Sequence, residues 1–177
     1  MAQSPPGGPK MEAQAQQRIL VVDDDPTILN VWRRVLGPKW RRPALDNLEK
    51  KLFGSTPPAT PPEVSFTIDT ATQGAEGLQK VVAALAEGQP YVFAIIDMRM
   101  PPGWDGLETI LRMLEKDPRL EVAICSAFSD IPQEEVIRRV GRPDLQWLKK
   151  PFQLESARDL ALKLSEQGVR RRQGFLR

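Results

Sequence analysis

A short apolar segment that ends in a single carboxylate constrains this chain more than any other feature. Residues 92–96 (VFAII) lead directly into Asp97, and MRMPPGWDG follows, so a strand ends here and the chain turns. An apolar run without alternation is typical of a strand covered on both faces, as in a parallel sheet. We therefore expect Asp97 to lie exposed at the carboxyl edge of a sheet, where open α/β sheets place their chemistry.

The apolar pattern predicts a strand followed by a helix five times along the chain. The expected strands are 18–22, 64–70, 92–96, 120–126 and 145–148, and the expected helices are 26–36, 74–87, 107–116, 132–140 and 154–166. The spacing predicts that Leu78, Val81, Val82 and Leu85 face inward on the second helix. This order favours an α/β fold of the (βα)5 type, a doubly wound parallel sheet of five strands with right-handed crossovers.

Three segments stand apart from this pattern. Residues 1–17 are rich in Pro, Gly, Gln and Ala, and we expect a disordered amino-terminal tail. Residues 38–63 contain GSTPPATPPE and form an insertion between the first helix and the second strand of a domain over 18–166. Residues 167–177 (GVRRRQGFLR from 168) are expected to be a basic carboxyl-terminal tail, with Arg170, Arg171 and Arg172 at a solvated helix end.

Composition excludes several classes of function. The net charge of +2 gives no argument for nucleic-acid binding, and no apolar run approaches the roughly 20 residues of a membrane span. The amino terminus lacks the apolar core of a signal peptide, so a cytoplasmic protein is expected. The chain has no histidine, which excludes a Ser-His-Asp triad and a phosphohistidine of its own. The single cysteine, Cys125, is expected to be a small buried side chain.

Polar side chains follow four of the five predicted strands. Asp23 and Asp24 follow the first, Asp97 the third, Ser126 ends the fourth and Lys150 follows the fifth. Parallel strands bring these residues to one edge of the sheet. Three neighbouring carboxylates repel one another and call for a cation, and oxygen ligands with room for water suit Mg²⁺. The lysine and the serine hydroxyl suit phosphoryl oxygens.

This arrangement resembles the receiver domain of bacterial two-component response regulators, a CheY-like, flavodoxin-like fold. The resemblance rests on VVDDDP, IIDMRMPPGWDG, AICSAFSD and LKKPF, in that order. It implies a phosphorelay protein that takes a phosphoryl group from a histidine kinase or phosphotransfer protein and then signals to a downstream protein target. It implies no direct nucleic-acid or membrane contact, and it allows a homodimer through the helix over 132–140, the strand over 145–148 and the helix over 154–166.

The resemblance assigns a role to each matching residue. It makes Asp97 the phosphoacceptor, Asp24 a direct Mg²⁺ ligand, Asp23 a ligand largely through water, Arg99 a ligand through its backbone carbonyl, Ser126 and Lys150 partners of the phosphoryl group, and Trp147 the switch aromatic, where Tyr or Phe is usual. It also implies a cis peptide at Lys150-Pro151. The chain departs from the family in the segment after Asp97, where the spacing to Asp105-Gly106 is one residue longer than usual.

Two alternatives remain open at this point. Asp23 and Asp25 after an apolar strand also fit the nucleophile motif of haloacid-dehalogenase-like phosphatases, although no late acidic pair follows Lys150 and Asp97 then has no role. Asp25 is expected instead to cap the following helix. A receiver fold could also act as an adaptor that ignores phosphorylation. Beyond slow self-phosphorylation and dephosphorylation, the sequence indicates no enzyme.

Overall fold

Five parallel strands form a single sheet with helices on both faces. The computed structural model describes residues 16–38, 64–127 and 131–174. The strands are β1 (Gln17–Val22), β2 (Phe66–Ala71), β3 (Phe93–Ile96), β4 (Glu121–Ser126) and β5 (Gln146–Lys149). The helices are α1 (Pro26–Leu36), α3 (Gly74–Ala86), α4 (Gly106–Lys116), α5 (Gln133–Val140) and α6 (Leu154–Arg172). The strand order is β2-β1-β3-β4-β5 and every pairing is parallel, which confirms the predicted doubly wound α/β fold.

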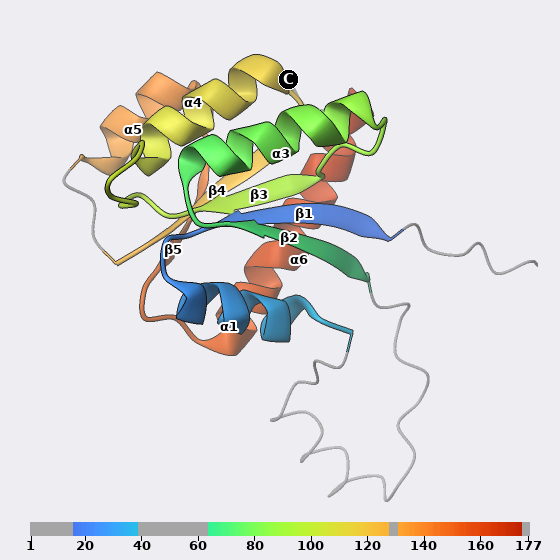
Figure 1. The fold of residues 1–177 in the computed structure, drawn as a ribbon, viewed down its shortest axis with the longest axis horizontal. Helices are drawn as coiled ribbons and strands as arrows, with labels where there is room; N and C mark the ends of the chain where they lie inside the picture. The colour runs from blue at the N-terminus through green and yellow to red at the C-terminus, as the bar shows by residue number, and fades with distance from the viewer. Residues whose placement is uncertain (1–15, 39–63, 128–130, 175–177) are drawn as a thin grey trace, which may run out of the picture.

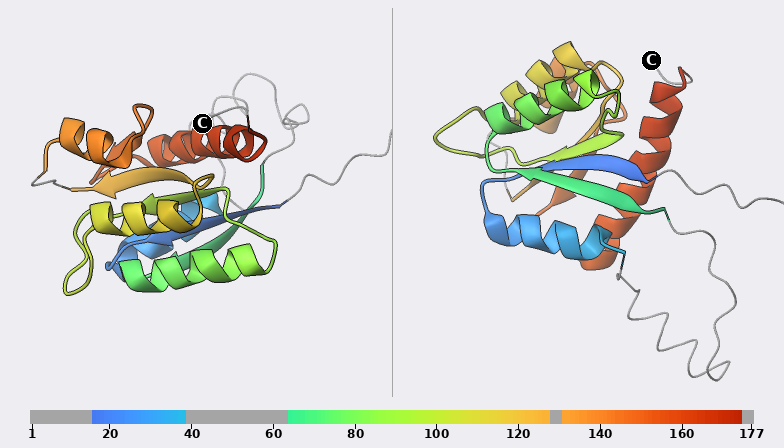
Figure 2. Two further views of the ribbon diagram at one scale, coloured as in Figure 1. Left: turned by 90° about the horizontal axis from the view of Figure 1, so that it is seen from above. Right: turned by 45° about the vertical axis from the view of Figure 1, so that its right-hand side comes forward.

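The helices form two layers. Figure 1 shows α1 and α6 on one face of the sheet and α3, α4 and α5 on the other, and the two further views in Figure 2 agree. Each layer packs its apolar stripe against the sheet, so the molecule has two cores separated by the strands.

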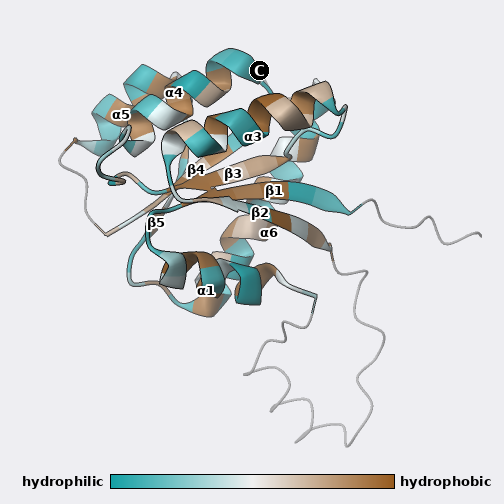
Figure 3. Ribbon diagram, in the orientation of Figure 1, coloured by the Kyte–Doolittle hydropathy of each residue, from teal (hydrophilic) through white to brown (hydrophobic). Residues whose placement is uncertain are grey.

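The two-sided burial explains why the central strands lack polar alternation. In β1, Leu20 and Val22 pack toward α3, α4 and α5, whereas Ile19 and Val21 pack toward α1 and α6. All four side chains are at most 1% exposed. The same alternation between cores recurs in β3 and β4. Coloured by hydropathy, β3 and the later part of β1 are brown, whereas the helices on both faces are banded in brown and teal (Figure 3).

Helices α1 and α3 lie where the sequence predicted them, but one residue of α3 that was predicted to face the core does not. The Asp25 carboxylate accepts a hydrogen bond from the Thr27 amide at 2.7 Å, so the prediction that Asp25 caps α1 is confirmed. On α3, Val81 is buried, but Val82 is 45% exposed and its predicted inward position is wrong. Val81 and Ala84 occupy the face of α3 that meets the sheet. Val82 is the next residue after Val81, so its side chain is rotated around the helix axis away from that face.

Helix α6 extends beyond its expected end at Glu166 and continues to Arg172. It packs so closely on the sheet that a Cβ atom at Gly168 would lie 2.4 Å from the Val92 carbonyl oxygen. The prediction of a solvated helix end is wrong for Arg171, which is buried. Part of the expected basic tail is therefore packed helix.

Other expectations fall on the margins of the described residues. The predicted amino-terminal tail lies outside them as far as residue 15, while Gln17, its last residue, belongs to β1. The predicted insertion lies outside them from 39 to 63. Cys125 is buried as expected, and burial raises the pKa of its thiol to about 12. Among the described residues, no helix has both the length and the apolar character that a membrane span requires.

Candidate phosphoacceptor site

The ends of adjacent strands bring the predicted site residues to one edge of the sheet. β1 and β3 are neighbours, so Asp23 and Asp97 follow their last strand residues side by side. Backbone hydrogen bonds extend the ladder by one step at both positions, from the Asp23 amide to the Ala71 carbonyl at 3.0 Å and from the Asp97 amide to the Val22 carbonyl at 2.9 Å. Each carboxylate is therefore held on rigid backbone.

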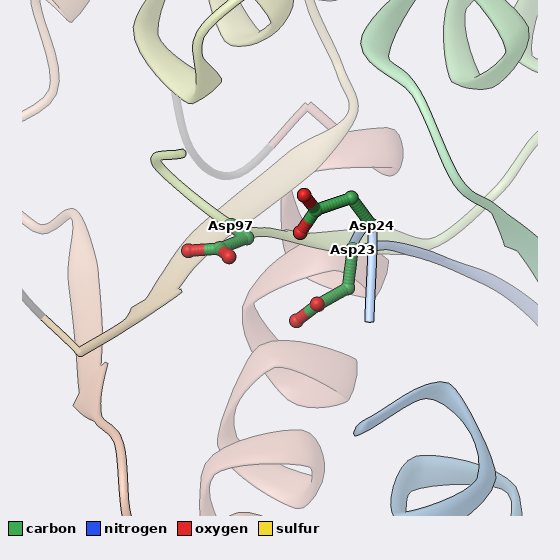
Figure 4. Close-up of side chains that lie close together, drawn as sticks. All are labelled: Asp23, Asp24 and Asp97. Atoms are coloured by element: carbon green, nitrogen blue, oxygen red, sulfur yellow. The ribbon is translucent and has the colours of Figure 1, made fainter. Parts of the chain in front are cut away.

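Three carboxylates form an acidic cluster at this edge. Asp23, Asp24 and Asp97 each offer one oxygen such that all three oxygens lie within 4.8 Å of one another (Figure 4). Asp23 is 1% exposed and Asp97 is 7% exposed, while Asp24 is more open to solvent. The expectation that Asp97 lies exposed is therefore wrong, because the segment after it folds back over the strand end.

Lys150 joins the two buried carboxylates. Its Nζ donates to Asp23 Oδ2 at 2.6 Å and to Asp97 Oδ2 at 3.0 Å. Burial opposes the charge of Lys150, but its bonds to Asp23 and Asp97 outweigh burial and raise its pKa. Burial raises the pKa of Asp23, and the hydrogen bond from Lys150 offsets this only in part. The Lys150-Pro151 peptide bond is cis, as expected, and the Lys150 amide donates to the Ser126 carbonyl at 3.0 Å.

The cluster fits a hard divalent cation. Asp97 Oδ1 is buried and has no hydrogen-bond partner within the described part of the chain, whereas Asp97 Oδ2 is bound by Lys150. A buried carboxylate oxygen without a donor is costly unless a cation or another donor reaches it. The atoms that could bind a cation here are all carboxylate oxygens, the ligand type that Mg²⁺ prefers.

The segment after Asp97 accommodates its extra residue before the next helix begins. Asp105 caps α4 by accepting from the Glu108 amide at 2.7 Å. Gly106 lies against the preceding strand end, where a Cβ would stand 2.3 Å from the Asp97 carbonyl oxygen. The Asp105-Gly106 pair thus keeps a fixed place, and the added length projects at residues 101–103, which include the cis Pro101-Pro102 bond.

Ser126 and Trp147 border a cavity between the end of β4, the start of α5 and β5. This cavity of about 310 Å³ is lined by residues of the β4–α5 segment and of β5, namely Ser126, Ala127, Ile131, Pro132, Gln133, Trp147, Leu148 and Lys149. The Trp147 ring packs against the core formed with α3, α4 and α5, and its Nε1 is buried without a partner among the described residues. Ser126 and Trp147 thus line the same cavity.

Gln73 lies at this end of the sheet and was missed in the sequence. It stands two residues after the end of β2, and its Nε2 donates to the Pro101 carbonyl at 3.2 Å. The signal that could have found it is its position after a strand end. Because Gln73 carries no charge, it does not stand out from its neighbours.

No family model matches the chain, but individual proteins of known sequence do. The transcriptional regulatory protein TctD of Salmonella typhimurium is 35% identical over 71 residues, which are 40% of this chain and 30% of TctD. The chain thus spans less than a third of TctD. The sporulation initiation phosphotransferase F of Bacillus subtilis is 31% identical over 91 residues, which are 51% of this chain and 69% of that protein.

Solved structures share the fold. A CheY-like response regulator receiver domain from Methanospirillum hungatei matches with a TM-score of 0.60 and 19% identity over 90% of this chain and 99% of its own. The response regulator TrrA from Thermotoga maritima, in complex with Mg²⁺-BeF, matches with a TM-score of 0.54 and 23% identity over 84% of this chain and 99% of its own. With two thirds of a phosphotransferase covered and the acidic cluster in place, the chain belongs to the response regulator receiver domain family of two-component systems.

Proposed function

We propose that this receiver domain takes a phosphoryl group onto Asp97 from the phosphohistidine of a kinase or phosphotransfer protein, in a Mg²⁺-dependent reaction. The observation that carries the proposal is the state of the Asp97 carboxylate. One of its oxygens is bound by Lys150, and the other is buried with no partner in the described residues. The end of β3 holds this carboxylate on rigid backbone beside Lys150, and such fixed orientation favours in-line attack.

The transfer balances without any group from this chain beyond the carboxylate. An Asp97 oxygen forms a bond to phosphorus while the bond from phosphorus to the partner's imidazole nitrogen breaks, and the imidazole takes up a proton from water and leaves neutral. The product is an acyl phosphate, which hydrolysis later returns to the carboxylate. Since the chain has no histidine, the donor nitrogen must come from the partner.

The remaining residues have roles that follow from their positions. Asp23, Asp24, Asp97 and the Arg99 backbone carbonyl would hold the Mg²⁺. The ion supplies positive charge beside the equatorial phosphoryl oxygens. Lys150, already bound to Asp97, supplies a second positive charge there. The Ser126 hydroxyl would donate to a phosphoryl oxygen, and Trp147 would fill the cavity beside it as Ser126 moves.

The movement would reshape the face formed by α5, β5 and α6 and change its affinity for a downstream protein or a second copy of the chain. We further propose that the receiver domain covers residues 18–166 together with the last turn of α6, and that the protein is cytoplasmic. The phosphatase alternative is less favoured because the Asp25 carboxylate it requires is engaged with the Thr27 amide.

Phosphorylation by acetyl phosphate with Mg²⁺, followed by intact mass, tests the proposal. We expect a gain of one phosphoryl group in the wild type and none in Asp97→Asn or with a chelator. Asp105→Asn is the matched control, because it removes a carboxylate from the same segment and keeps a side chain that caps α4. No gain in the wild type would contradict the proposal and favour a phosphorylation-independent adaptor. An equal gain in Asp97→Asn would mean that another residue is the acceptor.

A further inference from the structure

The segment between β3 and α4 is anchored unequally along its length. Met98 and Met100 are 4% and 1% exposed and pack into the core under α3, α4 and α5, while Arg99 between them is exposed. The Gly106 amide donates to the Met98 carbonyl at 3.0 Å and closes the far end. The projecting part at 101–103 therefore lacks the apolar anchors that hold its neighbours.

Gln73 ties this projecting part to another element, in addition to the local hydrogen bond from the Gly103 amide to the Met100 carbonyl. The segment lies beside the start of α3 in all the ribbon views (Figures 1 and 2). Gln73 stands at the amino-terminal cap position of α3, but its side chain makes no capping bond. Instead, Gln73 Nε2 reaches across to the Pro101 carbonyl at 3.2 Å.

Gly103 gives the Gln73 amide its space. A Cβ at position 103 would lie 2.3 Å from Gln73 Oε1, which is itself buried without a hydrogen-bond partner in the described residues. Gly103 does not have the positive φ that would by itself favour glycine. A side chain at position 103 would therefore displace the Gln73 amide, and this effect comes from close approach and not from backbone conformation.

We propose that Gln73 is a positioning residue that fixes the lengthened segment after Asp97, so that the Arg99 backbone carbonyl completes the Mg²⁺ site. The inference rests on the proposed function. Pro101 stands two residues after Arg99, so a tether on the Pro101 carbonyl limits how far the Arg99 peptide can move. The hydrogen bond from Gln73 to Pro101 thus restrains the segment that the extra residue lengthens.

Calorimetric titration with Mg²⁺ alone tests this role without any phosphoryl transfer. We expect Gln73→Ala to bind Mg²⁺ about three- to tenfold more weakly than the wild type, because one hydrogen bond to a neighbour of a ligand is lost. Gln79→Ala, which removes an exposed glutamine from the same helix, is the matched control and should keep wild-type affinity. A purely structural role would lower the thermal midpoint and leave the affinity of the folded protein unchanged.

A double-mutant cycle adds a second readout. Gly103→Ala forces the flexible Gln73 amide aside and breaks the same contact, so it should weaken Mg²⁺ binding by a similar factor. Because both changes remove one interaction, Gln73→Ala with Gly103→Ala should be no weaker than either alone. Additive losses, or wild-type affinity in Gln73→Ala, would overturn the inference.

The two proposals fail in different ways. If the wild type binds Mg²⁺ and accepts a phosphoryl group while Gln73→Ala binds Mg²⁺ equally well, only the role of Gln73 is wrong. If the wild type neither binds Mg²⁺ nor accepts a phosphoryl group, the proposed function fails and the role of Gln73 fails with it.

Discussion

At the residue scale, Lys150 supplies the positive charge beside the buried carboxylates of Asp23 and Asp97. Both carboxylates contact the Lys150 ammonium, which places this charge between them. We expect Lys150→Ala to slow phosphorylation by acetyl phosphate by about 100-fold or more, because a preorganised charge at the reacting group is lost. The rate of mass gain measures this. Lys149→Ala, which removes the exposed neighbouring lysine, should change the rate less than twofold, and equal losses in the two variants would contradict the assignment.

A second residue-scale prediction concerns Asp69 on β2, far from the acidic cluster in sequence. Asp69 Oδ2 accepts from Tyr91 Oη at 2.7 Å and from Arg18 Nε at 2.8 Å. Burial opposes its ionisation, but these two hydrogen bonds outweigh burial and lower the pKa of Asp69. A lowered pKa stabilises the fold at pH values above the ordinary 3.8, and this stabilisation is lost as pH falls through the folded value.

We therefore expect Asp69→Asn to lower the free energy of unfolding by about 1 kcal/mol at pH 7, since the pair is partly exposed. The difference from the wild type should shrink as pH falls below 3.8. Urea unfolding at a series of pH values measures it. Glu87→Gln removes the more exposed partner of Arg18 and should have a smaller effect. A deficit that stays constant down to pH 3 would show that charge is not its cause.

The site residues differ in how far the sequence could predict them. Asp23, Asp24, Asp97 and Lys150 follow strand ends, and parallel pairing alone brings strand ends together, so their meeting was predictable. The burial of Asp97 was not, because it depends on how the next segment folds back over the strand. The contact of Gln73 with Pro101 joins residues 28 positions apart and requires a segment conformation that no local pattern indicates.

At the element scale, the last turn of α6 is a structural clamp at the end of the sheet opposite the site. Arg171 Nε donates to Glu121 Oε2 at 2.7 Å, and its Nη2 donates to Asp144 Oδ2 at 3.0 Å. Arg172 reaches Asp117 at 2.7 Å. The helix thus ties itself to the start of β4 and to the segments before β4 and β5.

We expect Arg171→Ala to lower the free energy of unfolding by about 3–5 kcal/mol, because Glu121 remains buried without its counter-charge. Burial already raises the pKa of Glu121 against the effect of Arg171. Combining Arg171→Ala with Glu121→Gln should recover part of the loss in a denaturant titration. Arg170→Ala is the control, since its salt bridge to Glu166 is exposed, and should cost under about 0.5 kcal/mol. Equal losses for Arg170 and Arg171 would refute the clamp.

The elements show where periodicity succeeds and where it does not. The spacing of apolar residues located α1, α4 and α5 because each has a single apolar stripe that meets the sheet. The end of α6 has no such stripe: its sequence GVRRR is mostly polar, and Arg171 is buried against acids that lie elsewhere in the chain. Charge pairing between distant segments carries no periodic signal, so the helix was predicted to end too early.

At the scale of the whole molecule, the site joins elements that are far apart in sequence. Asp23, Asp97 and Lys150 come from the ends of β1, β3 and β5, so a ligand that bridges them ties three strands together. Such a ligand binds the folded chain and not the unfolded one, and therefore raises stability by mass action. Because the strand order brings the ends of β1, β3 and β5 together, ligand binding at this site stabilises the whole sheet.

We expect Mg²⁺ with beryllofluoride, the combination present in the TrrA complex, to raise the thermal midpoint of the wild type. At 100 times the dissociation constant the gain is about 2.7 kcal/mol, which corresponds to roughly 5–10 °C for a domain of this size. Asp97→Asn removes the carboxylate to which the fluoride complex would bind, so its thermal midpoint should show only the smaller shift due to Mg²⁺. Asp105→Asn should behave as the wild type. Differential scanning calorimetry distinguishes these outcomes, and an equal shift in Asp97→Asn would mean that the stabilising ligand binds elsewhere on the fold.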